Sequence, residues 1–150
     1  LAVEYGGSPI VMTSWHHAHQ GLQAGQRAPD GPVVDARDGA RTTLFEAMRG
    51  TGHVLLGFGA GDETGPLLQA AEAAVERHGS HVRALLVMPG EERPPAGFSH
   101  VDPGGKLHGL YGASAPSLYC IRPDGYVGLA CRPPDIVAVG RYFARIFRSD

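Results

Sequence analysis

Two runs of mostly apolar residues stand in the middle of the chain, His53–Phe58 and 81–88. Runs of this length without strict alternation are typical of strands that are covered on both faces of a sheet. Farther on, two shorter apolar runs flank Asp124 and Gly125, and an Asp-Gly pair in that setting is a strong signal of a tight β-hairpin. The pattern therefore predicts strands at 33–35, 53–58, 81–88, 98–101, 117–121 and 126–130, and a short edge strand at 8–12.

Between these runs the pattern changes to helical spacing. Thr43 and Glu46 have the Ser/Thr-x-x-Glu form of a capping box, so we expect a short helix there that ends at Gly50. Pro66 suits the first turn of a longer helix. Helices are thus predicted at 43–49, 66–78, 106–111 and 135–147. The predicted apolar faces are Leu67, Ala70, Ala71, Ala74 and Val75 in the second helix, and Ile136, Val139, Tyr142, Phe143 and Ile146 in the last.

The order of these elements predicts an α/β domain with a mixed central sheet and helices on both faces. This is the thioredoxin-like arrangement. We expect residues 33–150 to form that domain and residues 1–32, rich in Gly, Pro, His and Gln, to be a linker arm from a preceding substrate domain. Pro116 directly precedes a predicted hairpin strand, where we expect a cis peptide bond.

Composition excludes several classes of protein. The chain has 150 residues, 43% of them hydrophobic, and a formal net charge of -2, so it lacks the basic surface of a nucleic-acid or acidic-membrane binder. No apolar run is long enough to span a membrane. Two cysteines are too few for a disulfide framework and are typical of a reducing cytoplasm. Arginine outnumbers the single lysine, a bias of GC-rich bacterial genomes.

A thioredoxin-like redox enzyme needs a thiolate at the N-terminus of the helix that follows its first long strand, because the helix dipole lowers the thiol pKa there. Residues 58–66 occupy that position and contain no cysteine. Thr64 has no evident activating base, and Asp62 and Glu63 would oppose a thiolate. The same loop fails the G-x-G-x-x-G pattern of a dinucleotide site, since Asp62 or Thr64 takes the third glycine place.

The remaining candidate residues give no recognisable site. Cys120 and Cys131 fall on the two hairpin strands out of register, so we interpret Cys120 as a small core residue and not as half of a disulfide. His16, His17 and His19 lie in the predicted arm without a scaffold for metal, and Trp15 is expected to pin that arm to a neighbouring surface. The other histidines, at 53, 78, 81, 100 and 108, have no nucleophile at a recognisable spacing, although a triad is spatial and the sequence leaves it open.

Several motifs together carry a family resemblance. Residues 25–30, Asp38-Gly39, Leu44-Phe45 and 53–58 look like the start of a redoxin-type domain. Residues 110–113 and 118–127, the latter containing Arg-Pro-Asp-Gly-Tyr-Val, sharpen the match. The chain resembles the C-terminal thioredoxin-like domain of the FAD-dependent aromatic-ring hydroxylases, the group of phenol and polyketide hydroxylases, over about residues 3–148.

This resemblance implies a parent chain that uses FAD, NAD(P)H and oxygen to hydroxylate an aromatic ring, with FAD and substrate domains N-terminal to the present residues. It implies that this part has no catalytic, cofactor-binding or metal-binding residue. Its role would be structural: packing on the parent's other domains, or forming a homodimer. Tyr142, Phe143 and Phe147 are the candidates for such a surface, with a core role expected for Phe143.

Two alternatives remain open. The first alternative is a free-standing redoxin-like protein with a lost or relocated cysteine, in which case Cys120 would be the residue to test. The second alternative is a small binding module that uses the cleft beside Pro116.

Overall fold

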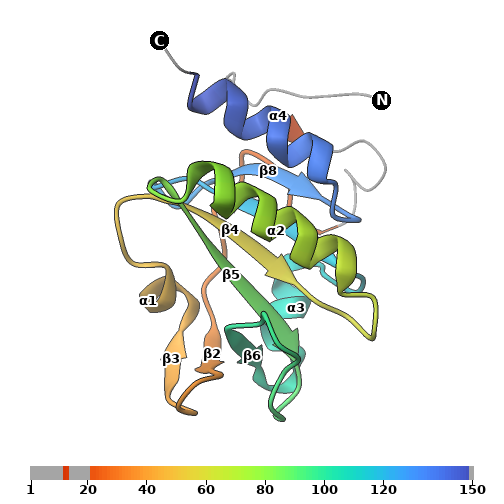
Figure 1. The fold of residues 1–150 in the computed structure, drawn as a ribbon. Coiled ribbons are helices and arrows are strands. Elements are labelled where there is room, and N and C mark those ends of the chain that lie inside the picture. The colour runs from red at the N-terminus through yellow and green to blue at the C-terminus, as the bar shows by residue number, and fades with distance from the viewer. Residues whose placement is uncertain (1–11, 14–20, 149–150) are drawn as a thin grey trace.

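In the computed structural model, residues 12–13 and 21–148 can be described. They form one mixed sheet of eight strands in the order β1-β8-β7-β4-β5-β6-β2-β3 (Figure 1). The strands are β1 (Met12–Thr13), β2 (Pro32–Asp35), β3 (Arg41–Thr43), β4 (His53–Phe58), β5 (Val82–Pro89), β6 (His100–Asp102), β7 (Ser117–Ile121) and β8 (Val127–Cys131). The helices are α1 (Leu44–Met48), α2 (Gly65–His78), the 3-10 turn η2 (Pro103–Gly105), α3 (Lys106–Tyr111) and α4 (Ile136–Ile146).

The centre of the sheet is a parallel pair, β4 and β5, with β7 antiparallel to β4 on the other side. β7 and β8 form the hairpin predicted from Asp124 and Gly125, and β6 continues the sheet parallel to β5. The β2–β3 hairpin closes one edge and β1 the other, where it runs parallel to β8. The central strands are therefore hydrogen-bonded on both sides, as their uninterrupted apolar sequences require.

Helices cover both faces of this sheet and create two cores. α2 and α4 lie on one face, where Leu67, Ala70, Tyr142 and Phe143 pack on the strands. The shorter α1 and α3 lie on the other face, and their buried side chains include Leu44, Leu107 and Tyr111. The predicted α/β, thioredoxin-like fold with helices on both faces is confirmed.

Most predicted elements are present within a residue or two of their expected bounds. The N-cap at Thr43 is confirmed, since its hydroxyl accepts a hydrogen bond from the Glu46 amide at 3.2 Å, while the Glu46 carboxylate pairs with Arg49. The sequence did not reveal β3. Of the edge strand predicted at 8–12, Met12 lies in β1, and the other positions fall outside the described residues.

The expectation of a cis bond before Pro116 is wrong. Among the described residues, the one cis peptide bond joins Arg132 to Pro133, after the hairpin. At Pro116 the turn is instead closed by the Ser117 hydroxyl, which donates to the carbonyl oxygen of Ala115 at 2.8 Å. Both prolines adjoin hairpin strands, so their position in the sequence alone does not distinguish them.

Residues 21–31, within the segment assigned to the linker arm, lie along the β7–β8 hairpin and α3. Leu22 and Ala28 are buried in the core of the α1–α3 face. The Gly25 amide donates to the carbonyl oxygen of Val127 at 2.8 Å, and the Val127 amide donates back to Gln26 at 2.9 Å. This part of the chain therefore contributes both core and hydrogen bonds to the domain.

Candidate functional site

The loop from Gly59 to Thr64 joins β4 to α2 and occupies the place of a thioredoxin-type redox site. Asp62 and Glu63 are exposed, and Thr64 precedes the helix without a side-chain capping hydrogen bond. No side chain in this loop combines nucleophilic character with a base in contact. The loop can offer backbone amides at the start of α2, but it places two carboxylates beside them.

The glycines that suggested a phosphate loop have a packing role. A Cβ atom added at Gly57 would come within 2.6 Å of the side chains of Leu67 and Leu86, and at Gly59 within 2.8 Å of Phe98. Only glycine therefore lets α2 and the β5–β6 loop approach β4 this closely. Close packing therefore accounts for glycine at these two positions without a bound phosphate.

Both cysteines are free, buried thiols in the hairpin. Cys120 pairs across the strands with Leu129, and Cys131 pairs with Leu118, so the two residues are not opposite each other, as their spacing predicted. Burial raises the pKa of Cys131 to about 12, with the Asp135 charge adding to the effect. Burial, followed by the neighbouring Cys131, also raises the pKa of Cys120 well above its ordinary value. Since the thiolate is the reactive form, neither thiol is prepared for exchange chemistry at neutral pH.

A buried Asp-His pair lies beneath the loop. Asp102 is fully buried and accepts hydrogen bonds from the Leu107 amide (3.1 Å), the His108 amide (2.8 Å) and His108 Nδ1 (2.7 Å). His108 Nε2 lies 2.9 Å from the carbonyl oxygen of Gly59. Burial acts to raise the pKa of Asp102, but the hydrogen bonds from His108 and Leu107 outweigh it, and the pKa lies below its usual value.

This pair holds the loop in place and presents no free catalytic atom. Every oxygen and nitrogen named above is engaged within the protein. Gly59, whose carbonyl oxygen contacts His108, is the last buried residue before the loop becomes exposed. The sequence analysis did not find this pair, although the six-residue spacing of Asp102 and His108 across a turn into α3 was the available signal.

The redoxin-like motif at 25–30 also has a structural role here. The Tyr111 hydroxyl donates to the carbonyl oxygen of Pro29 at 2.6 Å. An Asp30 carboxylate oxygen accepts from the Phe45 amide at 2.9 Å and so caps the start of α1. The motif thus fastens the segment before β2 to α1 and α3.

The other predicted site residues are dispersed. Pro116 is half-buried at the start of β7, and His53, His78 and His81 gather around Phe147 at the opposite end of the sheet. Within residues 12–13 and 21–148, no three His, Cys, Asp or Glu side chains converge as a metal site requires. Trp15 and the histidines at 16, 17 and 19 lie outside the described residues.

The surface expected from the last helix is only partly available. Tyr142 and Phe143 are fully buried, which confirms the core role of Phe143 and rules Tyr142 out of any docking surface, while Phe147 is half-buried. The exposed apolar side chains of α4 are Ile136 and Val137. Tyr142 points inward because it packs over Gly128, which leaves room for its ring.

Two hollows flank α1. One, of about 350 Å³, lies between α1 and the β7–β8 turn and is rimmed by Arg27, Arg49 and Arg122. The other, of about 520 Å³, lies between α1 and the strands β2, β5 and β6 and is lined in part by Arg37, Arg83 and His100. Asp35 and His100 are neighbours because β2 and β6 pair with these two residues opposite each other. No local sequence signal predicts this register.

Solved structures share this fold. Aklavinone-11 hydroxylase, in a complex with FAD and aklavinone, matches with a TM-score of 0.62 and 24% identity over 85% of this chain and 22% of its own. The flavin-dependent monooxygenase PieE, in complex with FAD and substrate, matches with a TM-score of 0.62 and 21% identity over 87% of this chain and 21% of its own. An exposed lipoprotein thioredoxin from Streptococcus pneumoniae matches with a TM-score of 0.56 and 20% identity over 78% of this chain and 99% of its own.

The chain thus spans about a fifth of the length of either flavoenzyme and almost the whole of the thioredoxin. The resemblance to FAD-dependent hydroxylases is confirmed at the level of the fold. None of the curated proteins matches the chain. In the part of the chain that the structure describes, no helix is long and apolar enough to cross a membrane.

The family model of the HcaD C-terminal domain matches residues 26–145, a span that begins in the segment before β2 and ends within α4. It therefore takes in β2 to β8, α1 to α3 and all but the last residue of α4. The chain belongs to the HcaD C-terminal domain family.

Proposed function

We propose that the chain is the C-terminal thioredoxin-like domain of a bacterial, cytoplasmic FAD-dependent aromatic hydroxylase, and that its own role is structural. In this proposal the FAD and substrate domains of the parent lie N-terminal to it and are its partners. The parent uses FAD and NAD(P)H to hydroxylate an aromatic ring. The domain packs on these partners or joins two copies of the parent.

The observation that carries the structural role is the state of the two thiols. A redox role in this fold needs an accessible thiolate at the start of α2. Here both thiols lie in the hairpin under α4, fully buried, with the pKa of each raised by burial. This disfavours the alternative of a redoxin with a relocated cysteine.

Two further observations support the assignment to a flavoenzyme. The family match is to a C-terminal domain, and two of the similar structures are flavin-dependent enzymes of which this chain matches about a fifth. Packing explains the glycines at 57 and 59, and the loop that follows carries the carboxylates of Asp62 and Glu63, which would repel a pyrophosphate. FAD is therefore assigned to the rest of the parent.

The test is carried out in the parent chain. We expect the purified parent to be yellow, and its Cys120→Ala/Cys131→Ala double variant to hydroxylate at an unchanged rate with an unchanged flavin content. A variant that ends before Gly21 should keep bound flavin but lose thermal stability or its oligomeric state. Size-exclusion chromatography and thermal melting measure these two losses.

Two results would contradict the proposal. A colourless protein of about the present length from the native host would remove the parent. A folded double cysteine variant with lost turnover would give the thiols a chemical role.

A further inference from the structure

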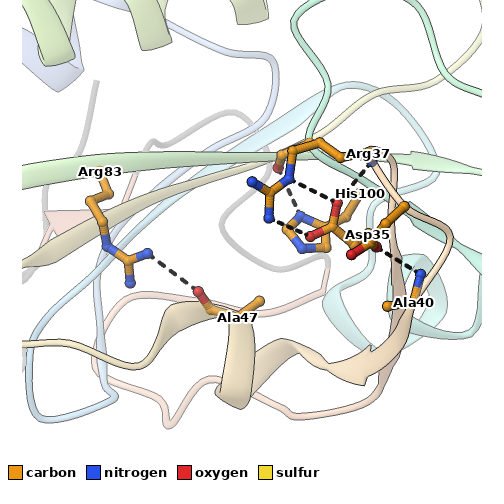
Figure 2. Close-up of polar contacts among 8 residues, drawn as sticks. Asp35, Arg37, Ala40, Ala47, Arg83 and His100 are labelled. Carbon is orange, nitrogen blue, oxygen red and sulfur yellow. Dashed lines mark hydrogen bonds and ion pairs between the residues drawn. The ribbon is translucent and has the colours of Figure 1, made fainter.

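The hollow between α1 and the strands β2, β5 and β6 has the size of a small-molecule site. Its volume is about 520 Å³, within the range of pockets that hold small organic ligands. It exists because α1 has only five residues and covers part of its face of the sheet. Its apolar lining includes Ala47 and Leu85, and polar groups enter from opposite sides. Figure 2 shows Arg83 at one side and Asp35, Arg37 and His100 together at the other.

His100 is the most unusual of these groups. Its side chain is 9% exposed, yet it lines the hollow. Nδ1 lies 2.8 Å from the Ser99 hydroxyl, while Nε2 has no hydrogen-bond partner among the described residues. Because one ring nitrogen is engaged and the other is not, Nε2 is available to a molecule in the hollow.

The Ser99 hydrogen bonds indicate what His100 offers. The Ser99 oxygen accepts from the Leu86 amide at 3.3 Å, and its nearest acceptors are His100 Nδ1 at 2.8 Å and the Leu86 carbonyl at 3.4 Å. The shorter contact favours donation from Ser99 to Nδ1, which leaves the proton of the neutral ring on Nε2. Burial lowers the pKa of His100, with Arg37 adding to the effect and Asp35 opposing it, so the ring is neutral at pH 7. His100 thus presents an N–H donor.

Among the described residues, Arg83 is the arginine of this hollow that has no carboxylate in contact. Arg37 binds Asp35 through Nε (3.3 Å) and a terminal nitrogen (3.1 Å), and Arg49 pairs with Glu46. Arg83 instead donates to three carbonyl oxygens at the end of α1, those of Ala47 (3.3 Å), Met48 (2.6 Å) and Arg49 (3.1 Å). These bonds fix its guanidinium at the edge of the hollow, without an ion-pair partner in the part of the chain that the structure describes.

We propose that this hollow binds a small organic monocarboxylate. The carboxylate accepts a hydrogen bond from His100 Nε2, the positive charge of Arg83 attracts it from the other side of the hollow, and the apolar body of the ligand rests on Leu85 and Ala47. A monoanion is favoured over a phosphate dianion, because the carboxylates of Asp35 and Glu46 also line the hollow and would repel the second charge. The proposal is independent of the function of the parent chain.

The test is an NMR titration of the 150-residue chain with sodium benzoate and sodium hexanoate up to 50 mM, at constant ionic strength set with chloride. We expect saturable shifts of the His100 Cε1 proton and Nε2 signals, with His53 and His108 unmoved. The pH midpoint of His100 should rise on saturation, because a bound anion favours the imidazolium. An adventitious surface interaction would shift these signals without saturation, and that result would overturn the proposal.

Variants separate the site from general charge effects. Arg83→Met should weaken binding by about tenfold, since it removes the positive charge that faces the carboxylate across the hollow. Arg141→Met, on the exposed side of α4, is the matched control and should bind as the original chain does. Because Arg83→Met also loosens α1, Thr42→Glu provides a second variant: it adds a carboxylate to the lining while leaving Arg83 in place, and should abolish binding.

Equal affinity in Thr42→Glu and the original chain would overturn the site. Binding of an acidic peptide in the absence of any benzoate or hexanoate binding would also overturn it, in favour of a protein partner.

Discussion

Three tyrosines in the core differ in how their hydroxyl groups are satisfied. Tyr111 donates to the carbonyl oxygen of Pro29 at 2.6 Å, and Tyr119 donates to the carbonyl oxygen of Tyr111 at 2.7 Å. The Tyr142 hydroxyl is buried and has no hydrogen-bond partner among residues 12–13 and 21–148. Burial raises the pKa of all three phenols, so each is protonated at neutral pH.

This difference predicts opposite outcomes for the same substitution. Tyr142→Phe removes an unsatisfied buried hydroxyl and should leave stability unchanged or raise it by about 1 kcal/mol. Tyr111→Phe leaves the Pro29 carbonyl without its partner and should cost about 1–2 kcal/mol. Urea denaturation of the two variants side by side measures both. A loss of stability in Tyr142→Phe as large as in Tyr111→Phe would show that the Tyr142 hydroxyl is satisfied.

Asp102 predicts an acid dependence of stability. Its pKa in the folded chain lies below the unfolded value, so the folded state binds its proton less readily. The resulting stabilisation is fully present above the unfolded pKa of about 4 and is lost as the pH falls through the folded pKa. Asp102→Asn should lose about 3 kcal/mol at pH 7, because it leaves buried His108 without its carboxylate.

The loss in Asp102→Asn should be smaller at pH 3 than at pH 7, because at pH 3, below the unfolded pKa, the original chain has begun to lose the same contribution. Denaturation at pH 7 and pH 3 tests this, with Asp38→Asn in the exposed β2–β3 turn as the control. A cost that is equal at both pH values would mean that the carboxylate acts only by its shape.

At the scale of elements, the C-terminal end of α4 rests on histidines from three other segments. Phe147 lies 5.2 Å from the ring of His53, 5.1 Å from His78 and 5.2 Å from His81, measured between ring centroids. Burial lowers the pKa of His53, with Arg122 and His81 adding to the effect and Asp124 opposing it. Burial, then Arg77 and His81, lowers the pKa of His78.

Neutral imidazoles therefore support this contact, and acidification should weaken it. Because both folded pKa values lie below the unfolded value of about 6.5, their stabilisation is complete above that pH and declines as the pH falls below it. His53→Leu removes one titrating ring, so the difference in Tm between pH 7.5 and pH 5.5 should narrow by about 2 °C. Thermal melting measures it. An unchanged difference would place the pH dependence elsewhere, His100 being the first alternative.

The sequence predicts well those elements whose signal lies in their own residues and not in contacts with distant segments. The β4 run, the Asp124-Gly125 hairpin and the Thr43 capping box each carry their signal within a few positions. β3 has no such signal, because Arg41–Thr43 is an edge strand of three residues held by pairing with β2. Its existence depends on a hairpin register that local pattern does not encode.

The candidate sites divide in the same way. The buried state of Cys120 followed from its place in an apolar hairpin, and the structure agrees. The hollow beside α1 could not be predicted, since it combines Asp35, Arg83 and His100 from three strands and depends on the shortness of α1. The Asp102–His108 pair depends on the turn at η2, which brings a strand end under the β4–α2 loop.

At the scale of the whole molecule, the question is whether the segment before β2, residues 21–31, is part of the folded domain. Leu22 and Ala28 are buried in the core, and the backbone of residues 25–28 exchanges hydrogen bonds with Val127 and Gly125. Pro29 and Asp30 hold Tyr111 and the start of α1. The sequence pattern places the boundary at residue 33, because Gly- and Gln-rich stretches resemble linkers when their tertiary contacts are not known.

Two truncations test which boundary yields a folded domain. A chain beginning at Gly21 keeps every contact just named and loses only β1 among the described strands, so we expect a cooperative urea transition within about 2 kcal/mol of the original. A chain beginning at Val33 loses the burial of Leu22, about 2 kcal/mol, and hydrogen bonds worth about 1 kcal/mol each. That sum approaches the whole stability of a typical domain, so this chain should be unfolded or expanded at 25 °C. A cooperative transition of the Val33 chain at the same urea concentration as the Gly21 chain would instead make residues 21–32 a linker that merely lies on the surface of the domain.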